Sequence, residues 1–341
     1  MAKVTVVGAT TWGTTLGIIL ARKDVPVTML VRTPEESVQL EAARETSRFL
    51  PGVEFPPSLS LSHDPQRALA LDGPEPGIVI LAVPSSSFRE NVRRIQGAIA
   101  GEPILVSASK GLEMDTGKRM SQVLEDELPS SLHHRVCVLS GPNLAMEVVN
   151  ENPSSAVVAS REQSVAAEAQ EVLMSPRFRV YTNEDIVGVE LGGALKNIIA
   201  LGAGICDGLA YGDNGKAAFM TRGLAEITRL GVAAGANPIT FAGLAGLGDL
   251  VATCASPLSR NHYLGAELAA GRRLDEVLAS MKNVAEGVYT TAAALKMAKE
   301  LGVEMPIARA TYRVLFEGLD PKQAVAELMG RPPRAESDGM G

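Results

Sequence analysis

The hydrophobic pattern of this 341-residue chain changes character near residue 185. Before that point, short apolar runs alternate with stretches at helical spacing. The predicted strands span residues 3–7, 25–31, 77–83, 103–107, 136–139, 156–159 and 178–181. Gly8 opens a turn into the first helix, which runs to about Lys23. Short, continuous apolar strands separated by helices are typical of a parallel sheet covered on both faces.

From residue 186 to about 330 the pattern predicts long helices without convincing strands. Asn237-Pro238, Met305-Pro306 and Asp320-Pro321 place proline at first helical positions, and Gly302 and Gly318 fit helix ends. Residues 331–341 have no periodicity and are expected to be disordered. We therefore predict a Rossmann-like, doubly wound α/β domain over residues 1–185, followed by an all-α domain over 186–330.

One lysine stands out in the helical half. Lys196 is the only charged residue between Leu191 and Cys206. Lysine is rarely buried without a partner or a task, because desolvation favours its neutral form, and a lysine with a lowered pKa can exchange a proton near neutral pH. A side chain that snorkels to the helix surface is the alternative. The surrounding segment contains four glycines, which are poor helix formers: Gly192, Gly193, Gly202 and Gly204. They make sense if another group must approach this backbone closely, so we place the chemistry at Lys196.

The turn after the first strand is Gly8-Ala9-Thr10-Thr11-Trp12-Gly13. It resembles the Gly-x-Gly-x-x-Gly turn that receives a dinucleotide pyrophosphate at a helix N-terminus, with Thr10 at the middle glycine. An ordinary tight turn is the alternative. The Thr10 Cβ is expected to point where phosphate approaches. At the end of the second strand Arg32 favours NADP over NAD, unless it is simply a solvated arginine.

Polar clusters follow other predicted strands or interrupt apolar helices. Lys110 lies in Ser107-Ala108-Ser109-Lys110-Gly111, and Ser140-Gly141-Pro142-Asn143 follows the strand from residue 136. In open α/β folds, ligands bind at this carboxyl edge of the sheet. Asp249 ends Gly246-Leu247-Gly248-Asp249, and Ser259-Arg260-Asn261 at a helix start suits a phosphate. Taken singly, each cluster fits a cap or turn better than a site.

Composition narrows the class of protein. Hydrophobic residues make up 46% of the chain and charged residues 21%, as in a soluble globular protein. A net charge of −7 argues against a general nucleic-acid binder. The three cysteines form no Cys-x-x-Cys pair, so neither a disulfide framework nor a metal site is indicated. Without a signal-peptide layout or an uninterrupted apolar span, we expect a cytoplasmic protein with no stable membrane insertion.

Taken together, these motifs resemble the bacterial-type NAD(P)-dependent glycerol-3-phosphate dehydrogenases. The resemblance is strongest in Gly-Val-Glu-Leu-Gly-Gly-Ala-Leu-Lys-Asn at 188–197, Gly-Leu-Gly-Asp-Leu at 246–250 and Ser-Arg-Asn at 259–261, and it includes Ser-Lys-Gly-Leu-Glu, Leu-Ser-Gly-Pro and Glu-Gly-Val. It implies interconversion of sn-glycerol 3-phosphate and dihydroxyacetone phosphate with NADP or NAD, for glycerophospholipid synthesis, by a homodimer in the cytoplasm.

The resemblance also implies roles for individual residues. Lys196 would be the proton donor and acceptor at the substrate C2 oxygen, and Asp249 would orient it or hold a substrate hydroxyl. The other implied substrate residues are Lys110, Gly141, Asn143, Ser259, Arg260 and Asn261. The implied cofactor residues are Gly8, Thr11, Trp12, Gly13, Arg32, Lys110, Ala145, Arg260, Val284 and Glu286.

The chain departs from the family pattern in two places. Thr10 and Thr11 replace Gly and Ser in the first turn. After Ser-Gly-Pro, Asn143, Leu144 and Met146 replace Ser or Thr, an aromatic residue and Lys, while Ala145 matches the pattern. Two alternatives therefore stay open. One is another dehydrogenase of the same architecture, of the β-hydroxyacid or 6-phosphogluconate type. The other is a sensor that binds NADP without turnover.

Overall fold

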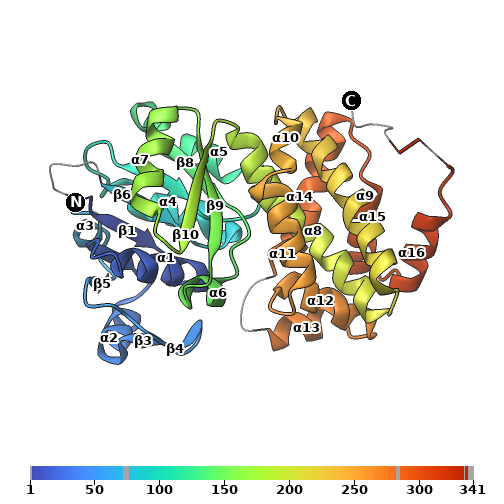
Figure 1. Ribbon diagram of the computed structural model, residues 1–341, viewed down its shortest axis with the longest axis horizontal. Helices are drawn as coiled ribbons and strands as arrows, with labels where there is room; N and C mark the ends of the chain where they lie inside the picture. The colour runs from blue at the N-terminus through green and yellow to red at the C-terminus, as the bar shows by residue number, and fades with distance from the viewer. Residues whose placement is uncertain (1, 72–76, 282–284, 334, 337–341) are drawn as a thin grey trace. The chain divides into compact units, whose positions relative to one another are not determined.

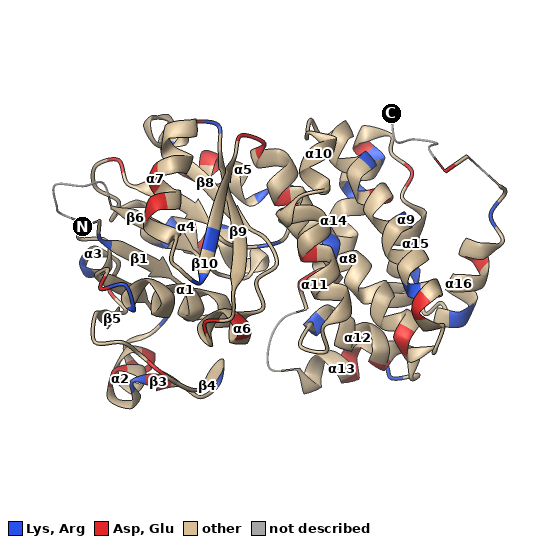
Figure 2. Ribbon diagram, viewed as in Figure 1, with Lys and Arg blue, Asp and Glu red and all other residues tan. Residues whose placement is uncertain are grey.

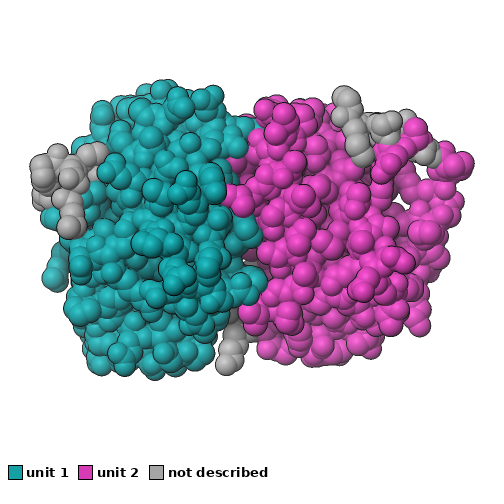
Figure 3. Space-filling view, viewed as in Figure 1, with its two compact units in different colours: residues 1–109, 120–186 teal, residues 110–119, 187–341 magenta. Residues whose placement is uncertain are grey.

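The computed structural model describes residues 2–71, 77–281, 285–333 and 335–336, which fall into two compact units (Figures 1 and 3). Unit 1 comprises Met1–Ser109 and Met120–Ile186, and unit 2 comprises Lys110–Arg119 and Val187–Gly341. The predicted boundary at residue 185 lies beside the observed change at 186. Residues 110–119 differ from the prediction, because they belong with the helical unit.

Unit 1 is built on a sheet of eight strands in the order β10-β9-β8-β7-β6-β1-β2-β5. The strands are β1 (Val4–Val7), β2 (Val27–Leu30), β5 (Leu59–Ser62), β6 (Ile78–Leu81), β7 (Ile104–Ser107), β8 (Val136–Ser140), β9 (Ser154–Ser160) and β10 (Phe178–Asn183). Every residue of β1, β6 and β7 is buried, so these central strands are covered on both faces as the apolar runs predicted.

The sheet is not parallel throughout, which corrects the prediction. Strand β9 runs antiparallel to β8, with Cys137 opposite Ser160, and β10 then runs parallel to β9. The apolar runs carry no information on strand direction, because antiparallel strands covered on both faces show the same pattern. The sequence pattern did not predict β5 or the hairpin of β3 (Glu45–Thr46) and β4 (Leu50–Glu54). These strands are short, contain polar residues and are buried at only some positions, so they form no continuous apolar run.

The helices of unit 1 connect these strands and pack against the sheet (Figure 1). Helix α1 (Thr11–Ala21) follows β1 directly and contacts β1 and β2, while α7 (Gln163–Leu173) contacts β9 and β10. The remaining helices are α2 (Pro34–Ala43), α3 (Pro65–Ala68), α4 (Phe88–Gln96), α5 (Met120–Glu127) and α6 (Ala145–Val149), with two 3₁₀ turns at Ser85–Ser87 and Ser130–Arg135.

Unit 2 is helical over its described residues beyond 186, as predicted. Its helices are α8 (Ile186–Gly208), α9 (Gly212–Ala233), α10 (Pro238–Phe241), α11 (Asp249–Ala255), α12 (Arg260–Ala269), α13 (Leu274–Ser280), α14 (Glu286–Leu301), α15 (Pro306–Phe316) and α16 (Pro321–Met329). All three predicted proline starts are confirmed, and Asn237 and Asp320 cap their helices through side-chain oxygens. Gly302 ends α14 in the left-handed conformation.

Two helical stretches, Ile186–Gly208 and Pro238–Ala255, are long and apolar enough to cross a membrane. In the first, 89% of the most apolar window is buried inside the protein, as in the core helix of a soluble protein. Figure 2 shows Lys and Arg scattered among Asp and Glu along both units. The expectation of no membrane insertion stays a prediction.

Candidate functional site

Helix α8 forms the centre of unit 2 and carries Lys196, which is only 6% exposed. The glycines that flank this lysine allow close contact between helices. A Cβ on Gly192 would lie 2.8 Å from the Ala245 carbonyl oxygen, and one on Gly204 would lie 2.0 Å from the His262 carbonyl oxygen. Glycine at 192 therefore lets a π-helical turn, Leu244–Gly248, pack directly on α8. Asp249 begins α11 immediately after this turn, beside Lys196.

Two lysines converge on one buried carboxylate. The Lys196 Nζ donates to Asp249 Oδ1 at 2.8 Å, and the Lys110 Nζ donates to Asp249 Oδ2 at 2.7 Å. Asp249 is 2% exposed. Residues that are 53 and 139 positions apart from Asp249 in sequence thus form one cluster inside unit 2. The structure thus brings together Lys110, Lys196 and Asp249, three of the candidate substrate residues.

Burial and the neighbouring charges determine the pKa values of Lys196 and Asp249. Burial lowers the pKa of Lys196 to about 8, with Asp249 opposing the shift and Lys110 adding to it. Burial alone would raise the pKa of Asp249, but the Lys110 and Lys196 ammonium groups outweigh it and hold that pKa below its ordinary value. Lys196 therefore changes its charge near physiological pH while Asp249 stays ionised, as an acid–base group and its orienting partner require.

Thr253, which was not among the predicted site residues, completes the cluster. Its hydroxyl accepts from the Lys196 Nζ at 2.5 Å and donates to the Asp249 carbonyl oxygen at 2.6 Å. The spacing contained a signal, because Thr253 lies four residues after Asp249 on the same helix face. With Asp249 and Thr253 as acceptors, the lysine ammonium has a fixed direction.

The phosphate-type motif lies at the start of α12. Ser259 caps this helix by accepting from the His262 amide at 3.3 Å. The Asn261 side chain is already used inside the protein: its amide donates to Asn197 Oδ1 at 2.8 Å, and its oxygen accepts from the Gly287 amide at 3.0 Å. These bonds join the helices that carry Lys196, Arg260 and Glu286. The Asn261 side chain therefore holds the Ser259-Arg260-Asn261 segment against α8 and α14.

Arg260 is the first residue of α12 and is exposed. Desolvation by the surrounding chain lowers the pKa of its guanidinium, and the Glu286 carboxylate at the start of α14 opposes that shift. A guanidinium near a helix N-terminus, with solvent access, suits a phosphate group. Val284, the neighbouring predicted cofactor residue, lies outside the described residues.

The β1–α1 turn of unit 1 has the close backbone packing of a dinucleotide site. Gly8 has φ +108°, and a Cβ on Gly13 would lie 2.1 Å from the Gly8 carbonyl oxygen. Thr10 is the N-cap of α1: its hydroxyl accepts from the Gly13 amide at 3.1 Å and donates to the Ala82 carbonyl at 2.6 Å. The Thr10 side chain is thus built into the turn by two hydrogen bonds.

Other observations in unit 1 also fit a bound cofactor. The Trp12 indole N–H and the Asn143 Oδ1 are buried and have no hydrogen-bond partner among the described residues. Such atoms are rare in folded proteins and are satisfied by a ligand or water. These two atoms, the glycine cradle and the eleven-residue α1 together fit the pyrophosphate and nicotinamide end of NAD(P).

The structure also places the remaining predicted residues of unit 1. Gly141 directly follows β8, and at φ +132° a Cβ there would meet Ala156 Cα at 3.0 Å. Asn143 donates to the Ser155 carbonyl at 3.1 Å, and Ala145 begins α6. Arg32 lies just beyond β2 with its side chain exposed. These positions at the carboxyl ends of strands agree with the predicted ligand edge.

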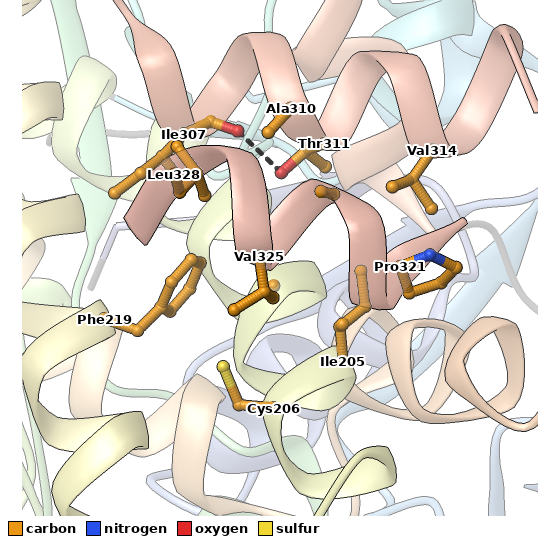
Figure 4. A pocket seen from close by; sticks show the side chains of 12 residues that line it. Ile205, Cys206, Phe219, Ile307, Ala310, Thr311, Val314, Pro321, Val325 and Leu328 are labelled. Carbon is orange, nitrogen blue, oxygen red and sulfur yellow. Dashed lines mark hydrogen bonds between the residues drawn. The ribbon is translucent and has the colours of Figure 1, made fainter. Parts of the chain in front are cut away.

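A separate cavity in unit 2 has a different character (Figure 4). It measures about 30 Å³ and lies between α8, α9, α15 and α16, with a mostly apolar lining that includes Phe219, Ile307 and Leu328. The Thr311 hydroxyl at its edge already donates to the Ile307 carbonyl. A cavity this small and apolar does not suit a phosphorylated substrate, so the lysine–aspartate cluster remains the candidate site.

A doubly wound unit with a dinucleotide turn, joined to a helical unit with a lysine of lowered pKa, defines a nicotinamide-dependent dehydrogenase. Models of the N-terminal and C-terminal parts of NAD-dependent glycerol-3-phosphate dehydrogenase match residues 3–166 and 185–326. The chain belongs to this family, and it is an NAD(P)-dependent oxidoreductase of glycerol 3-phosphate.

Individual relatives agree along the whole chain. Glycerol-3-phosphate dehydrogenase [NAD(P)+] of Dehalococcoides mccartyi is 48% identical over 99% of this chain and 94% of its own. The Geobacillus thermodenitrificans enzyme of the same name is 49% identical over 100% and 98%. The crystal structure of glycerol-3-phosphate dehydrogenase from Coxiella burnetii has a TM-score of 0.90 and 35% identity, covering 97% of this chain and 99% of that one.

Proposed function

We propose that Lys196 transfers the proton in the interconversion of sn-glycerol 3-phosphate and dihydroxyacetone phosphate. The observation that carries this proposal is the bond from the buried Lys196 ammonium to Asp249, together with a lysine pKa near 8. When the ketone is reduced, Lys196 donates its proton to the C2 oxygen as charge develops there. In the reverse reaction the neutral amine removes the C2 hydroxyl proton.

Lys110 and Asp249 support this transfer. The Asp249 carboxylate fixes the direction of the Lys196 ammonium, and Thr253 fixes it from a second side. The Lys110 ammonium, 19% exposed in its side chain, is the second positive charge of the cluster and stabilises negative charge on the C2 oxygen. When bound, the nicotinamide supplies or accepts the hydride at C2.

The substrate phosphate is proposed to bind at the N-terminus of α12. Arg260 would pair with the phosphate oxygens, and the helix amides would donate to them. The buried Asn197–Asn261–Gly287 bonds support this role, because they hold the start of α12 against the helix that carries Lys196.

The decisive experiment follows NAD(P)H oxidation at 340 nm with dihydroxyacetone phosphate, using both cofactors. We expect turnover with the phosphorylated ketone, and none when 3-hydroxyisobutyrate or 6-phosphogluconate is offered with NAD(P)+. Oxidation of either of those acids instead would favour the alternative dehydrogenase. Cofactor binding without turnover of any substrate would identify a sensor.

The location, oligomeric state, metabolic role and cofactor preference of the protein are also proposals. We infer a cytoplasmic homodimer that supplies glycerol 3-phosphate to glycerophospholipid synthesis, with Arg32 favouring NADP. Family membership and the exposed position of Arg32 beyond β2 support these proposals. Comparing kcat/KM for NADPH and NADH in wild type and Arg32→Ala tests the cofactor preference, which should shift towards NADH in the variant.

A further inference from the structure

The loop of residues 110–119 carries Lys110 into unit 2. It leaves β7, returns to α5 and closes on itself: Leu112 forms an antiparallel bridge with Arg119, and the Glu113 amide donates to the Lys118 carbonyl at 2.9 Å. This pairing brings the two ends of the loop together. Lys110 and Arg119, nine residues apart in sequence, therefore lie at the same end of the loop.

The loop is attached to unit 2 by contacts of different kinds. Leu112 is 1% exposed and packs into the apolar core that includes Leu191 and Leu195 of α8. At the tip of the loop, the Asp115 carbonyl accepts from the Lys296 ammonium of α14. At the open end, the Arg119 guanidinium pairs with the Glu190 carboxylate of α8, and the two side chains are 9% and 7% exposed.

We propose that Arg119 and Glu190 form a positioning pair that holds the Lys110 ammonium against Asp249. The inference rests on the proposed roles of Lys110 and Lys196. Glu190 and Lys196 lie on the same helix, so the ion pair ties the loop to the element that carries the proton donor. The pair is almost fully buried, so water and salt screen its Coulomb attraction only weakly. This attraction holds the end of the loop in place.

Loss of the pair has a defined consequence for Lys110. Its side chain is partly exposed, so a loosened loop lets the ammonium exchange Asp249 for water. Asp249 then has one counter-charge, and Lys196 loses the positive neighbour that helps to lower its pKa. Turnover should fall, and the pH limit of the reaction should move upward.

Glu190→Gln tests this directly, because it removes the charge and nearly preserves the shape. We expect kcat for dihydroxyacetone phosphate reduction to fall by about 10–100-fold, since a misplacement of about 1 Å can cost about 10²-fold. The upper limb of the pH profile should shift to higher pH. Arg119→Lys, which keeps the charge, should retain more activity than Arg119→Gln.

Glu127→Gln is the matched control. The Glu127 carboxylate is 11% exposed and pairs with Arg89 and Arg93 in unit 1. Glu127→Gln removes a carboxylate about as buried as that of Glu190, although its partners Arg89 and Arg93 are more exposed (21% and 60%) than Arg119. It does not touch the loop, so kcat and the pH profile should not change. A loss in the control as large as in Glu190→Gln would mean that lost stability, and not positioning, explains the result.

A double-mutant cycle with Lys110→Ala separates positioning from a structural role. If Glu190 acts through Lys110, Glu190→Gln should change the residual activity of the Lys110→Ala enzyme less than twofold, far below its single effect. Equal losses in both backgrounds would overturn the proposal. The paired variant Arg119→Gln/Glu190→Gln leaves no lone buried charge. Its kcat should also fall, and wild-type kcat in this folded variant would overturn the proposal as well.

Failure of the proposed function has a different signature. In that case the unsubstituted protein shows no reduction of dihydroxyacetone phosphate. Failure of the positioning role leaves a fully active wild type in which the cycle shows no coupling between residues 110 and 190.

Discussion

Lys196 combines burial, a carboxylate partner and a second ammonium in one small volume. Each of these acts on its pKa, and burial dominates. A surface lysine would stay charged throughout the physiological range and could not act as a base. The Lys196 environment thus gives an ordinary side chain the acid–base behaviour that reversible ketone reduction needs.

The pH dependence of turnover follows from this pKa of about 8. Ketone reduction needs the ammonium form, so kcat should be constant below pH 8 and fall as the pH rises through it. Alcohol oxidation needs the free amine, so its kcat should rise over the same interval. Rate profiles measured in both directions check this. Two outcomes would show that Lys196 does not transfer the proton. One is that both rates change in the same direction with pH, and the other is a midpoint near 10.5, the ordinary pKa of lysine.

Arg260 should act mainly on substrate affinity. Arg260→Ala is expected to raise KM for dihydroxyacetone phosphate by about 10–10²-fold and to change KM for unphosphorylated dihydroxyacetone far less. A charge-assisted guanidinium–phosphate contact contributes about 1.5–3 kcal/mol, and water replaces it poorly. Steady-state kinetics with both ketones decide the matter. An equal loss for the two would place Arg260 outside the phosphate site.

At the scale of elements, side-chain caps stabilise the starts of individual helices in both units. Thr10 caps α1 within the dinucleotide turn, and Glu226 of α9 accepts from the Ile307 and Ala308 amides at the start of α15. The second cap joins residues 81 and 82 positions apart. Sequence patterns indicate the helix starts through their prolines, but a cap supplied by another helix leaves no local signal.

Thr10→Gly should therefore destabilise the protein without tightening cofactor binding. The substitution removes one helix cap and the bond to the Ala82 carbonyl, so we expect a loss of about 0.5–2 kcal/mol in the free energy of unfolding. Urea denaturation and NADPH fluorescence titration measure the two effects. A tenfold gain in affinity would show that the threonine obstructs the cofactor after all.

Glu226 should make stability depend on pH. Burial raises its pKa to about 7, although the two backbone amides that donate to the carboxylate act in the opposite direction. The folded state therefore binds this proton more tightly than the unfolded state. The stabilisation from the protonated form is complete below about pH 4.5 and is lost as the pH rises through 7. Compared with wild type, Glu226→Gln should lose less unfolding free energy between pH 5 and 8. Parallel urea titrations of both proteins at each pH check this, and equal pH slopes would contradict it.

The apolar runs predicted most strands and the change to helices near residue 185, because burial on both faces leaves a strong signal. They did not predict the antiparallel β8–β9 pair, the polar edge strand β5 or the transfer of residues 110–119 to unit 2. Lys196 was prominent as a lone charge in an apolar helix. Thr253 and Glu190 were not, because their roles arise from partners brought close only by folding.

At the scale of the whole molecule, each unit contributes a different part of the chemistry. Unit 1 holds the glycine cradle and the capped helix proposed for a dinucleotide. Unit 2 holds the cluster proposed for proton transfer, with Lys110 from the loop of residues 110–119. The family assignment agrees with this division, since separate models match the two halves of the chain. We therefore expect activity to require both parts, and cofactor binding not to require Lys196.

The central claim is that Lys196 transfers the proton, and the most direct measurement is turnover and NADH affinity in Lys196→Ala. General acid–base catalysis contributes about 10²–10⁴-fold, so kcat should fall by that factor while the Kd for NADH changes less than about twofold. The exposed lysine variant Lys299→Ala should match wild type in both quantities. A fall in kcat of less than about tenfold in Lys196→Ala, with the protein folded, would contradict the account.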